Sequence, residues 1–478
     1  MIDEIENNVD NNLEINNFDI ENSERNYYAN FMEKIGFTKI VWIMFTLASL
    51  LQWIWGSETC FISINMDFLG KNREIKQSII SLCVCLLYSM MGIGAALVGI
   101  LCNKLGRIYT LNLSIYIYVI VTILCSLIPK LNFYIILFLR CLSNINVGIM
   151  NIVVLNLLCE FLPIKYRSLI LMINSGFYNF GNLFTILLNN YMLDVEIFND
   201  YYWKIVNVIL IIPGILSLII IVFWGSESPL YLLNKNNLKK GFTLIEYMMN
   251  RLLQDNEKEK LIYSIKCKKN YKLSSNYSEL FTKDYIFLTI GSLIICSICY
   301  LNMIGITYLI PKTLQDLGDS IYNLSYYYQI FIYGIIQLPN GFIGGFMTES
   351  KVFGRKVTIW ISALFCAIFY FISFFNMKYV AIYAGIIMLF NSICYGVAFI
   401  YISEIFPTNL RDNAQSFIQC FSFFLGSWSP YVVDAFPYKY SYGFFGFSNI
   451  IIVVIAIMFP IETHMRPLDE DISKIDLQ

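Results

Sequence analysis

Two short stretches of this sequence, "EFLPIKYR" (160–167) and "SEIFPTNLR" (403–411), carry the same pattern of charge and proline half a chain apart. Each contains a glutamate, then a proline, then an arginine, at Glu160, Pro163 and Arg167 and again at Glu404, Pro407 and Arg411. The second copy follows the first at a fixed distance, because 404 − 160, 407 − 163 and 411 − 167 all equal 244. The repeat predicts that one structural unit occurs twice in the chain.

The composition indicates that lipid surrounds most of the chain. Of its 478 residues, 57% are hydrophobic and 14% are charged, whereas a soluble protein carries about 25% charged residues. Apolar runs of roughly 20 residues, long enough for a helix to cross a bilayer, recur twelve times. The fifth and eleventh runs, at 168–192 and 413–434, are interrupted by Asn, Gly, Ser or Pro. We therefore expect an all-α membrane protein with twelve transmembrane helices.

One long polar stretch divides the predicted helices into two groups of six. Because the repeated pattern occurs once in each group, we expect two pseudo-symmetric six-helix bundles with a substrate site between them. The expected segments are an acidic disordered cytoplasmic tail at 1–35, a first bundle at 36–225, a cytoplasmic loop with amphipathic helices at 226–284, a second bundle at 285–462 and a cytoplasmic tail at 463–478.

The distribution of Lys and Arg predicts the orientation of the chain. Basic residues are more numerous in the segments on the side of the termini and the long loop, which places that side in the cytoplasm. Within the loop, Phe242, Ile245, Met249 and Leu252 recur at helical spacing, which predicts an amphipathic helix. Packing on the protein and lying on the membrane surface are both open for this helix. A plasma membrane and an intracellular vesicle membrane both fit the arrangement.

Several classes of function are excluded by the composition. The net charge of −1 gives no electrostatic basis for a nucleic-acid partner. With a single histidine, His464, the chain offers neither a Ser/His/Asp set nor a zinc site built on histidine. The long loop contains no phosphate-binding loop of the G-x-x-x-x-G-K-S/T type. We therefore expect no enzyme activity, no metal and no cofactor, in a protein that is monomeric in the bilayer.

Five further stretches resemble signatures of the major facilitator superfamily. "GILCNKLGRI" (99–108) and "GFMTESKVFGRK" (345–356) resemble the loop motif that follows the second and eighth helices, with Asn103 replacing the acid in the first copy. "RCLSNINVGI" (140–149), "ESPLYLL" (227–233) and "IETHMRPLDE" (461–470) resemble the motifs of the fourth helix, the sixth helix and the tail. The organic cation/anion and synaptic-vesicle-protein-like branch is the most similar, followed by the sugar porters.

This resemblance implies a transporter that works by alternating access, with charged residues at helix ends closing the cytoplasmic side. Arg107 with Glu160, and Arg355 with Glu404, would form equivalent contacts in the two halves. The predicted cytoplasmic gate consists of Asn103, Gly106, Arg107, Glu160, Arg167, Glu349, Gly354, Arg355, Glu404 and Arg411. Helix capping and the preference of basic residues for the cytoplasmic side are the alternative explanation, above all for Arg167 and Arg411.

Two charged residues, Glu58 and Arg140, lie well inside predicted membrane helices. A charge at the bilayer centre costs roughly 3 kcal/mol or more, so such residues pair or line a wet cavity. Each lies ~12 Å from the outer end of its helix at ~1.5 Å per residue, and the resemblance makes the first and fourth helices neighbours. We expect Glu58 and Arg140 to face each other or share a water. Proton coupling, facilitated diffusion and a purely structural pair are all open.

Other polar and aromatic residues in the predicted helices suit a cavity for a small organic solute. The predicted cavity residues are Tyr178, Asn182, Asn302, Tyr308, Gln337, Asn391, Tyr395 and Trp428. Arg140 would be able to meet a carboxylate, and the rings an apolar or cationic group. We expect a secondary active or facilitative transporter of an organic ion, a vitamin-like acid or a sugar. A non-transporting membrane sensor or scaffold on the same fold is the alternative, and Asn103 is compatible with it.

Overall fold

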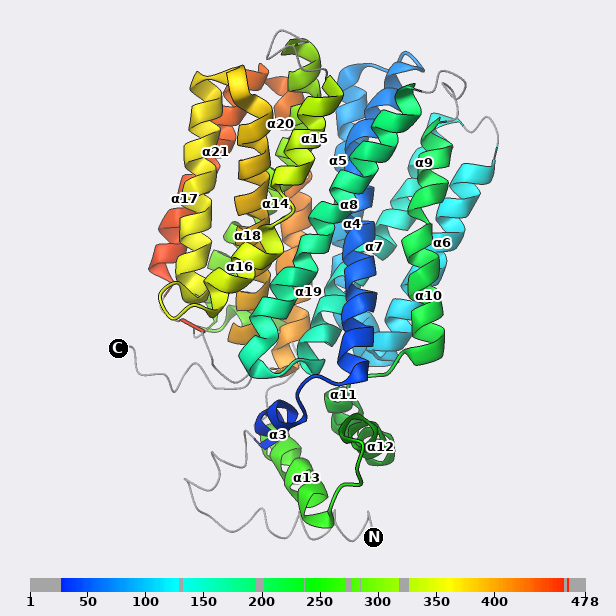
Figure 1. Ribbon diagram of the computed structural model, residues 1–478, viewed down its shortest axis with the longest axis vertical. Helices are drawn as coiled ribbons and strands as arrows, with labels where there is room; N and C mark the ends of the chain where they lie inside the picture. Colours follow the sequence, from blue (N-terminus) through cyan, green and yellow to red (C-terminus); the bar gives the residue numbers. More distant parts are fainter. Residues whose placement is uncertain are drawn as a thin grey trace.

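The computed structural model describes residues 27–128, 132–194, 202–235, 237–270, 277–283, 285–317, 326–406, 408–459 and 462–463. All regular elements among these residues are helices. They form two bundles that stand side by side, with a group of short helices beneath one end (Figure 1). We call the end of the bundles near these short helices the α12 side and the opposite end the far side.

The first bundle contains six helical segments that run between the two sides. They are α4 (Lys39–Lys71), α5 (Gln77–Leu105), α6 (Arg107–Leu127), α7 (Phe133–Phe161), α8 (Arg167–Asp194) and the broken pair α9 (Tyr202–Leu210) and α10 (Ile212–Trp224). A 3-10 turn, η1 (Ile164–Tyr166), joins α7 to α8. The break before α10 coincides with Pro213, because proline lacks the N–H that would continue the helix.

The second bundle repeats this arrangement. Its segments are α14 (Ile286–Leu317), the broken pair α15 (Tyr326–Ile336) and α16 (Asn340–Glu349), α17 (Gly354–Phe375), α18 (Val380–Ile405), the broken pair α19 (Thr408–Gly426) and α20 (Ser429–Ala435), and α21 (Tyr438–Met458). Short 3-10 turns, η3 (Tyr277–Phe281) and η5 (Met377–Tyr379), precede α14 and α18. Pro339 and Pro430 lie at the starts of α16 and α20, so proline again marks both breaks.

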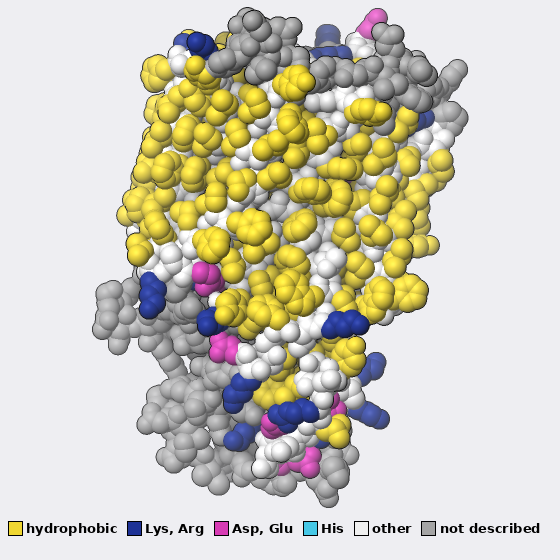
Figure 2. Space-filling view, in the orientation of Figure 1, with side chains coloured by type: hydrophobic (Ala, Val, Ile, Leu, Met, Phe, Trp, Pro, Cys, Tyr) yellow, Lys and Arg dark blue, Asp and Glu magenta, His cyan; other side chains and the backbone are white. Residues whose placement is uncertain are grey.

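The twelve segments carry an apolar outer surface suited to lipid. Ten of the described segments are long and apolar enough to span a membrane. The other two, α8 and α19–α20, are the segments interrupted by polar residues, and they run alongside the rest in Figure 1. Hydrophobic side chains cover the visible face of the bundles, whereas charged side chains gather around the short helices (Figure 2). The structure therefore has the predicted twelve-helix architecture.

Glycines allow several helices to pack backbone against backbone. A Cβ on Gly56 of α4 would lie 1.9 Å from the carbonyl oxygen of Tyr178 in α8. One on Gly148 of α7 would lie 2.1 Å from the carbonyl oxygen of Met91 in α5. Such contacts are the usual means of bringing membrane helices together. Between the bundles, α8 packs against α15 and α16, and α5 packs against α19 and α20.

The group of short helices consists of α3 (Tyr27–Ile35), α11 (Pro229–Asn234), α12 (Leu238–Met249) and α13 (Asp255–Asn270). Residues 27–35, which the sequence placed in a disordered tail, are helical instead, because Phe31 and Met32 are buried where α3 packs against α13. Residues 1–26 of that predicted tail lie outside the described residues.

The predicted amphipathic helix is present as α12. Its Phe242 and Ile245 are buried, and the helix packs against α11. Leu252 lies beyond the end of α12 and is 80% exposed. The apolar face of α12 therefore packs on the protein, which was one of the two possibilities open from the sequence.

Candidate functional site

Glu58 and Arg140 form an ion pair inside the first bundle. Arg140 Nη1 donates to the two Glu58 carboxylate oxygens at 2.9 and 3.1 Å, and both side chains are fully buried. Tyr118 of α6 donates its hydroxyl to Glu58 at 2.8 Å, and Asn207 of α9 accepts from Arg140 Nη2. The ring of Phe61 lies 4.0 Å from the guanidinium carbon. The predicted contact is present, and the partners named here all belong to the first bundle.

A cavity of about 30 Å³ lies between the two bundles. Its lining residues are Gln52, Trp55, Leu155, Leu171, Ser175, Tyr178, Met303, Ser392, Tyr395, Gly396, Phe399 and Ile400. They come from α4, α7 and α8 of the first bundle and from α14 and α18 of the second. The ring centroid of Trp55 lies 4.5 Å from that of Tyr178 and 5.8 Å from that of Tyr395. A space of this size can hold water but is far smaller than the roughly 300 Å³ of a usual small-molecule site, so the walls lie close together.

The predicted cavity residues divide among several places. Tyr178 and Tyr395 line the cavity, whereas Trp428 is 54% exposed beside Tyr431. Asn182, Asn302, Gln337 and Asn391 are buried in the helices without lining it, and Tyr308 belongs to a polar cluster on the far side that is described below. Sequence reasoning missed Gln52 and Trp55. One feature of the sequence could have pointed to Trp55 as a cavity residue, namely its place one helical turn before Glu58 on α4.

On the α12 side, Arg107 joins the first bundle to the second. Its guanidinium forms a buried ion pair with Glu160 at the end of α7. Its Nη2 also lies 3.0 Å from the Asp412 carboxylate in α19. Asn156 of α7 donates to the other Asp412 oxygen at 2.8 Å. Asp412, which the sequence analysis did not include, is therefore the point where this arginine reaches the opposite bundle.

Arg355 makes the equivalent contacts from the second bundle. Its Nε lies 3.2 Å from a Glu404 oxygen, and its Nη2 donates to the Ser168 hydroxyl of α8 at 2.7 Å. Ser168 in turn donates to Glu349. Because 412 − 168 is also 244, Ser168 and Asp412 occupy equivalent positions in the repeat. We call Arg107, Glu160, Asp412, Arg355, Glu404 and Ser168 the α12-side network.

The other predicted gate residues surround this network. Arg167 is buried at the start of α8, and Arg411 donates through Nε to the Ser403 carbonyl oxygen at 2.7 Å. Gly106 and Gly354 have φ values of +92° and +59°, in the left-handed region that glycine adopts without strain. The side chain of Asn103 and the whole of Pro407 lie outside the described part of the chain.

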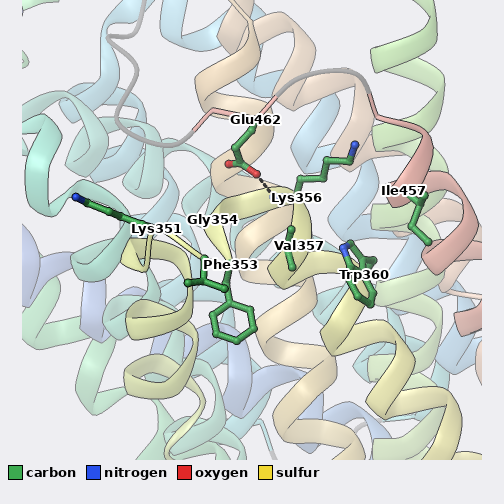
Figure 3. Close-up of a pocket in the computed structure, with 9 residues that line it drawn as sticks. Lys351, Phe353, Gly354, Lys356, Val357, Trp360, Ile457 and Glu462 are labelled. Carbon is green, nitrogen blue, oxygen red and sulfur yellow. Dashed lines mark hydrogen bonds between the residues drawn. The ribbon is translucent and has the colours of Figure 1, made fainter. Parts of the chain in front are cut away.

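Two carboxylates cap the helices that follow these glycines. Glu227 accepts from the backbone N–H of Ile108 at 3.1 Å, at the start of α6. Glu462 accepts from the N–H groups of Arg355 and Lys356 at 2.8 and 2.9 Å, at the start of α17, where it borders a surface pocket of about 720 Å³ (Figure 3). Burial raises the pKa of the Glu227 carboxyl, although the backbone donors and Arg107 oppose that shift. Both caps come from the stretches that resemble the motifs after the sixth and twelfth helices.

A polar cluster on the far side also joins the two bundles. Lys312 of α14 lies 2.7 Å from the Asp434 carboxylate of α20 and 3.6 Å from the Asp67 carboxylate of α4. Gln77 of α5 donates to Asp67 at 2.8 Å and to Asp434 at 3.1 Å. Ser81 and Tyr308 also donate their hydroxyls to Asp434, both at 2.9 Å. We call these six residues the far-side cluster.

The sequence did not reveal the far-side cluster. Asp67, Lys312 and Asp434 lie near helix ends, where charges are common because water solvates them. Only the packing of α4 and α5 against the second bundle brings these side chains together. Together with the α12-side network, the cluster joins the two bundles at both ends.

The comparison with known proteins decides the family. The family model described as "Sugar (and other) transporter" matches residues 15–473. The chain belongs to this family. The transporter is 22% identical over 364 residues to the niacin transporter NiaP of Acinetobacter baylyi, covering 76% of this chain and 79% of that one. It is 21% identical over 436 residues to the arabinose-proton symporter of Bacillus subtilis, covering 87% and 91%.

The fold of this transporter matches solved structures of the major facilitator superfamily. The proton:xylose symporter XylE bound to 6-bromo-6-deoxy-D-glucose superposes with a TM-score of 0.75 at 18% identity, covering 90% of this chain and 97% of that one. The inward-open conformation of XylE from E. coli gives a TM-score of 0.67. The protein is thus a small-solute membrane transporter, which is not a class of enzyme.

Proposed function

We propose that this transporter carries a small organic solute by alternating access and that the structure represents its occluded state. The observation that carries the proposal is that polar contacts join the two bundles on both sides of the cavity, in the α12-side network and in the far-side cluster. Opening one end requires only the contacts at that end to break, so the two closures provide for access from each side in turn.

We further propose that the α12 side faces the cytoplasm and that one chain forms the working unit in the bilayer. The excess of Lys and Arg on this side supports the orientation. A cysteine placed at Lys235, which is exposed near α11, tests it. In intact cells, a membrane-impermeant maleimide should leave this cysteine unlabelled until the membrane is permeabilised. Labelling of intact cells would contradict the orientation, and a dimer measured in detergent by light scattering would contradict the monomer.

We propose that transport is coupled to protons through Glu58. Trp55 lines the cavity and lies one helical turn from Glu58, so the same part of α4 carries both the cavity wall and the acid of the ion pair. Protonation of Glu58 would remove its charge and weaken the contact with Arg140. Two of the relatives are named as proton symporters, which supports the same proposal.

The test is uptake into liposomes that hold the purified protein, with labelled sugars, organic acids, organic bases and neutral amides supplied singly. An inward proton gradient should accelerate uptake of the transported solute by the natural protein, and Glu58→Gln should abolish that acceleration while keeping solute exchange at zero gradient. Glu257→Gln, in the partly exposed α13, is the matched control and should behave like the natural protein. Acceleration unchanged in Glu58→Gln would exclude Glu58, and binding without any flux would contradict transport.

A further inference from the structure

We propose that the surface pocket at the start of α17 binds one phospholipid with an anionic headgroup, taken from the bilayer leaflet on the α12 side. This pocket is separate from the cavity between the bundles, so the inference goes beyond the proposed transport of a solute. It follows from the size and place of the pocket, from its apolar wall and from the two lysines that flank it.

The pocket has room for a lipid headgroup. Its volume is about 720 Å³, within the range of roughly 300–1,000 Å³ that is usual for small-molecule sites. It lies where the loop after α16, the start of α17 and the end of α21 meet (Figure 3). Its lining residues are Lys351, Val352, Phe353, Gly354, Lys356, Val357, Trp360, Ile457 and Glu462.

One wall of the pocket continues the lipid-facing surface of the second bundle. Ile457 of α21 is 55% exposed, and its neighbours Val454 and Met458 are similarly exposed. Figure 2 shows hydrophobic side chains over the visible face of the bundles, with Lys and Arg side chains at the lower edge of this apolar surface. Trp360 also lines the pocket, and tryptophan is enriched at the level of lipid headgroups. The pocket therefore lies at the border between acyl chains and headgroups.

The rest of the pocket carries two lysines that are free to bind an anion. Lys351 and Lys356 lie on different sides of the pocket in Figure 3, and neither forms an ion pair with a described residue. Glu462, the acid of the pocket, accepts from the backbone N–H groups of Arg355 and Lys356 at 2.8 and 2.9 Å. The start of α17 therefore holds this carboxylate, and the flexible lysine side chains can reach a phosphate.

The two kinds of wall together favour a lipid over a soluble anion. A soluble phosphate would contact the lysines and leave the apolar side chains in water, including Val352, which is 81% exposed. An anionic phospholipid places its phosphate near the lysines and its acyl chains along α21, so it also covers apolar surface. Basic pockets at the ends of membrane helices are typical sites for such headgroups.

The repeat indicates that the site belongs to the second bundle alone. The counterpart of this loop in the first bundle lies 248 positions earlier, because the two glycines with positive φ at the starts of α17 and α6 are at 354 and 106. Asn103 and Ile108 stand there in place of Lys351 and Lys356. The halves share the loop but differ in these basic residues, so we expect one bound lipid per chain.

The experiment is native mass spectrometry of the purified full-length protein, titrated in detergent with dioleoylphosphatidylglycerol. Dioleoylphosphatidylcholine has the same acyl chains and no net charge, so it tests the role of the headgroup. We expect one phosphatidylglycerol to bind about tenfold more tightly than phosphatidylcholine, because two lysines act on its phosphate. Glycerophosphoglycerol, the same headgroup without acyl chains, should not displace the bound lipid.

Two double variants connect this binding to the pocket. Lys351→Gln/Lys356→Gln should weaken phosphatidylglycerol binding about tenfold and leave phosphatidylcholine binding unchanged. Lys104→Gln/Lys165→Gln removes the same charge from exposed positions on the α12 side of the first bundle and should bind both lipids as the natural protein does. Ile457→Ser changes the apolar wall and should weaken the binding of both lipids.

The outcomes decide between a built lipid site and its alternatives. Equal binding of the two lipids by the natural protein, or unchanged phosphatidylglycerol binding by Lys351→Gln/Lys356→Gln, would overturn the inference. An equal loss in both double variants would also overturn it, because the lysines would then act only through the overall surface charge. Displacement by glycerophosphoglycerol would overturn it in favour of a soluble anion. Solute flux in liposomes is measured separately, so none of these results decides the proposed function.

Discussion

At the scale of single residues, the two arginines of the α12-side network are not equivalent in strength. Arg107 reaches the opposite bundle through the Asp412 carboxylate, whereas Arg355 reaches it through the Ser168 hydroxyl. Asp412 and Ser168 occupy the same position in the repeat. Both halves therefore contact the opposite bundle there, although one partner is a carboxylate and the other is a hydroxyl. Both contacts involve a charged group, for which a hydrogen bond contributes about 1.5–3 kcal/mol. The Asp412 carboxylate adds a second, opposite charge, so its contact with Arg107 also gains a Coulombic attraction.

This difference predicts unequal effects of two matched substitutions. Asp412→Asn removes one charge from the contact with Arg107 and should lower the melting temperature more than Ser168→Ala, which removes a neutral hydroxyl that accepts from Arg355 and donates to Glu349. The difference in unfolding free energy should be about 1 kcal/mol. Melting of the purified variants followed by tryptophan fluorescence provides the measurement. An equal or larger loss in Ser168→Ala would contradict the assigned roles.

Sequence reasoning succeeds for residues whose burial is itself unusual. Glu58 and Arg140 stood out because charges are rare in apolar helices, and their matching depths placed them together. Asp67 and Lys312 could not be linked in the same way, because they lie near helix ends and belong to different bundles. Their pairing depends on how the two bundles pack against each other, and no local sequence pattern indicates that packing.

At the scale of helices, close backbone contacts position the elements that hold the site. α7 carries Arg140 and Glu160, and it approaches α5 most closely at Gly94 and Gly148. A Cβ on either glycine would lie 2.0 or 2.1 Å from a carbonyl oxygen of the partner helix. Neither helix can shift far, because both pack against further helices of the bundle.

We therefore expect Gly148→Ala to disrupt the packing of α5 against α7. The new methyl group would meet the Met91 backbone, so the loss should reach about 1–3 kcal/mol of unfolding free energy, the usual range for overpacking. Gly443→Ala is the control, because there the nearest atoms, at 3.2 Å, belong to the Phe374 side chain, which can move. Thermal unfolding of both variants measures the effect. The prediction fails if both variants melt at the same temperature.

The glutamate caps predict a local effect on helix starts. Glu462→Ala removes the acceptor for two backbone N–H groups of α17 and should cost about 1 kcal/mol, the typical value for a lost N-terminal cap. Hydrogen exchange of the amides at Arg355 and Lys356 should become faster, while Glu462→Gln, which keeps an acceptor oxygen, should show a smaller change. Unchanged exchange at these amides in Glu462→Ala would rule out capping.

The helices themselves were predictable to different degrees. Apolar length alone identifies most of the spans, as the ten segments that satisfy a simple hydropathy criterion illustrate. α8 and α19–α20 correspond to the least clear of the twelve apolar runs, because Asn, Gly, Ser or Pro interrupt them. Residues 27–35 were misjudged as tail, because the apolar face of α3 is short and acquires a partner only when α13 folds nearby.

At the scale of the whole molecule, the duplication explains the two-bundle architecture and the placement of the α12-side network. The repeat predicted two bundles with matching contacts at one end, and the α12-side network has that form. The far-side cluster could not be predicted, because its residues do not belong to the repeated pattern. Alternating access requires the contacts at the two ends of the bundles to break independently.

Hydrogen exchange followed by mass spectrometry tests this claim most directly, by comparing Lys312→Ala with Asp412→Asn. Lys312→Ala breaks the far-side cluster, so exchange should become faster at the far-side ends of α4, α5, α14 and α20 and stay slow on the α12 side. Asp412→Asn should produce the opposite pattern, with faster exchange where α6, α7 and α19 meet. Faster exchange at both ends in either variant, or at neither end in both, would contradict alternating access through these contacts.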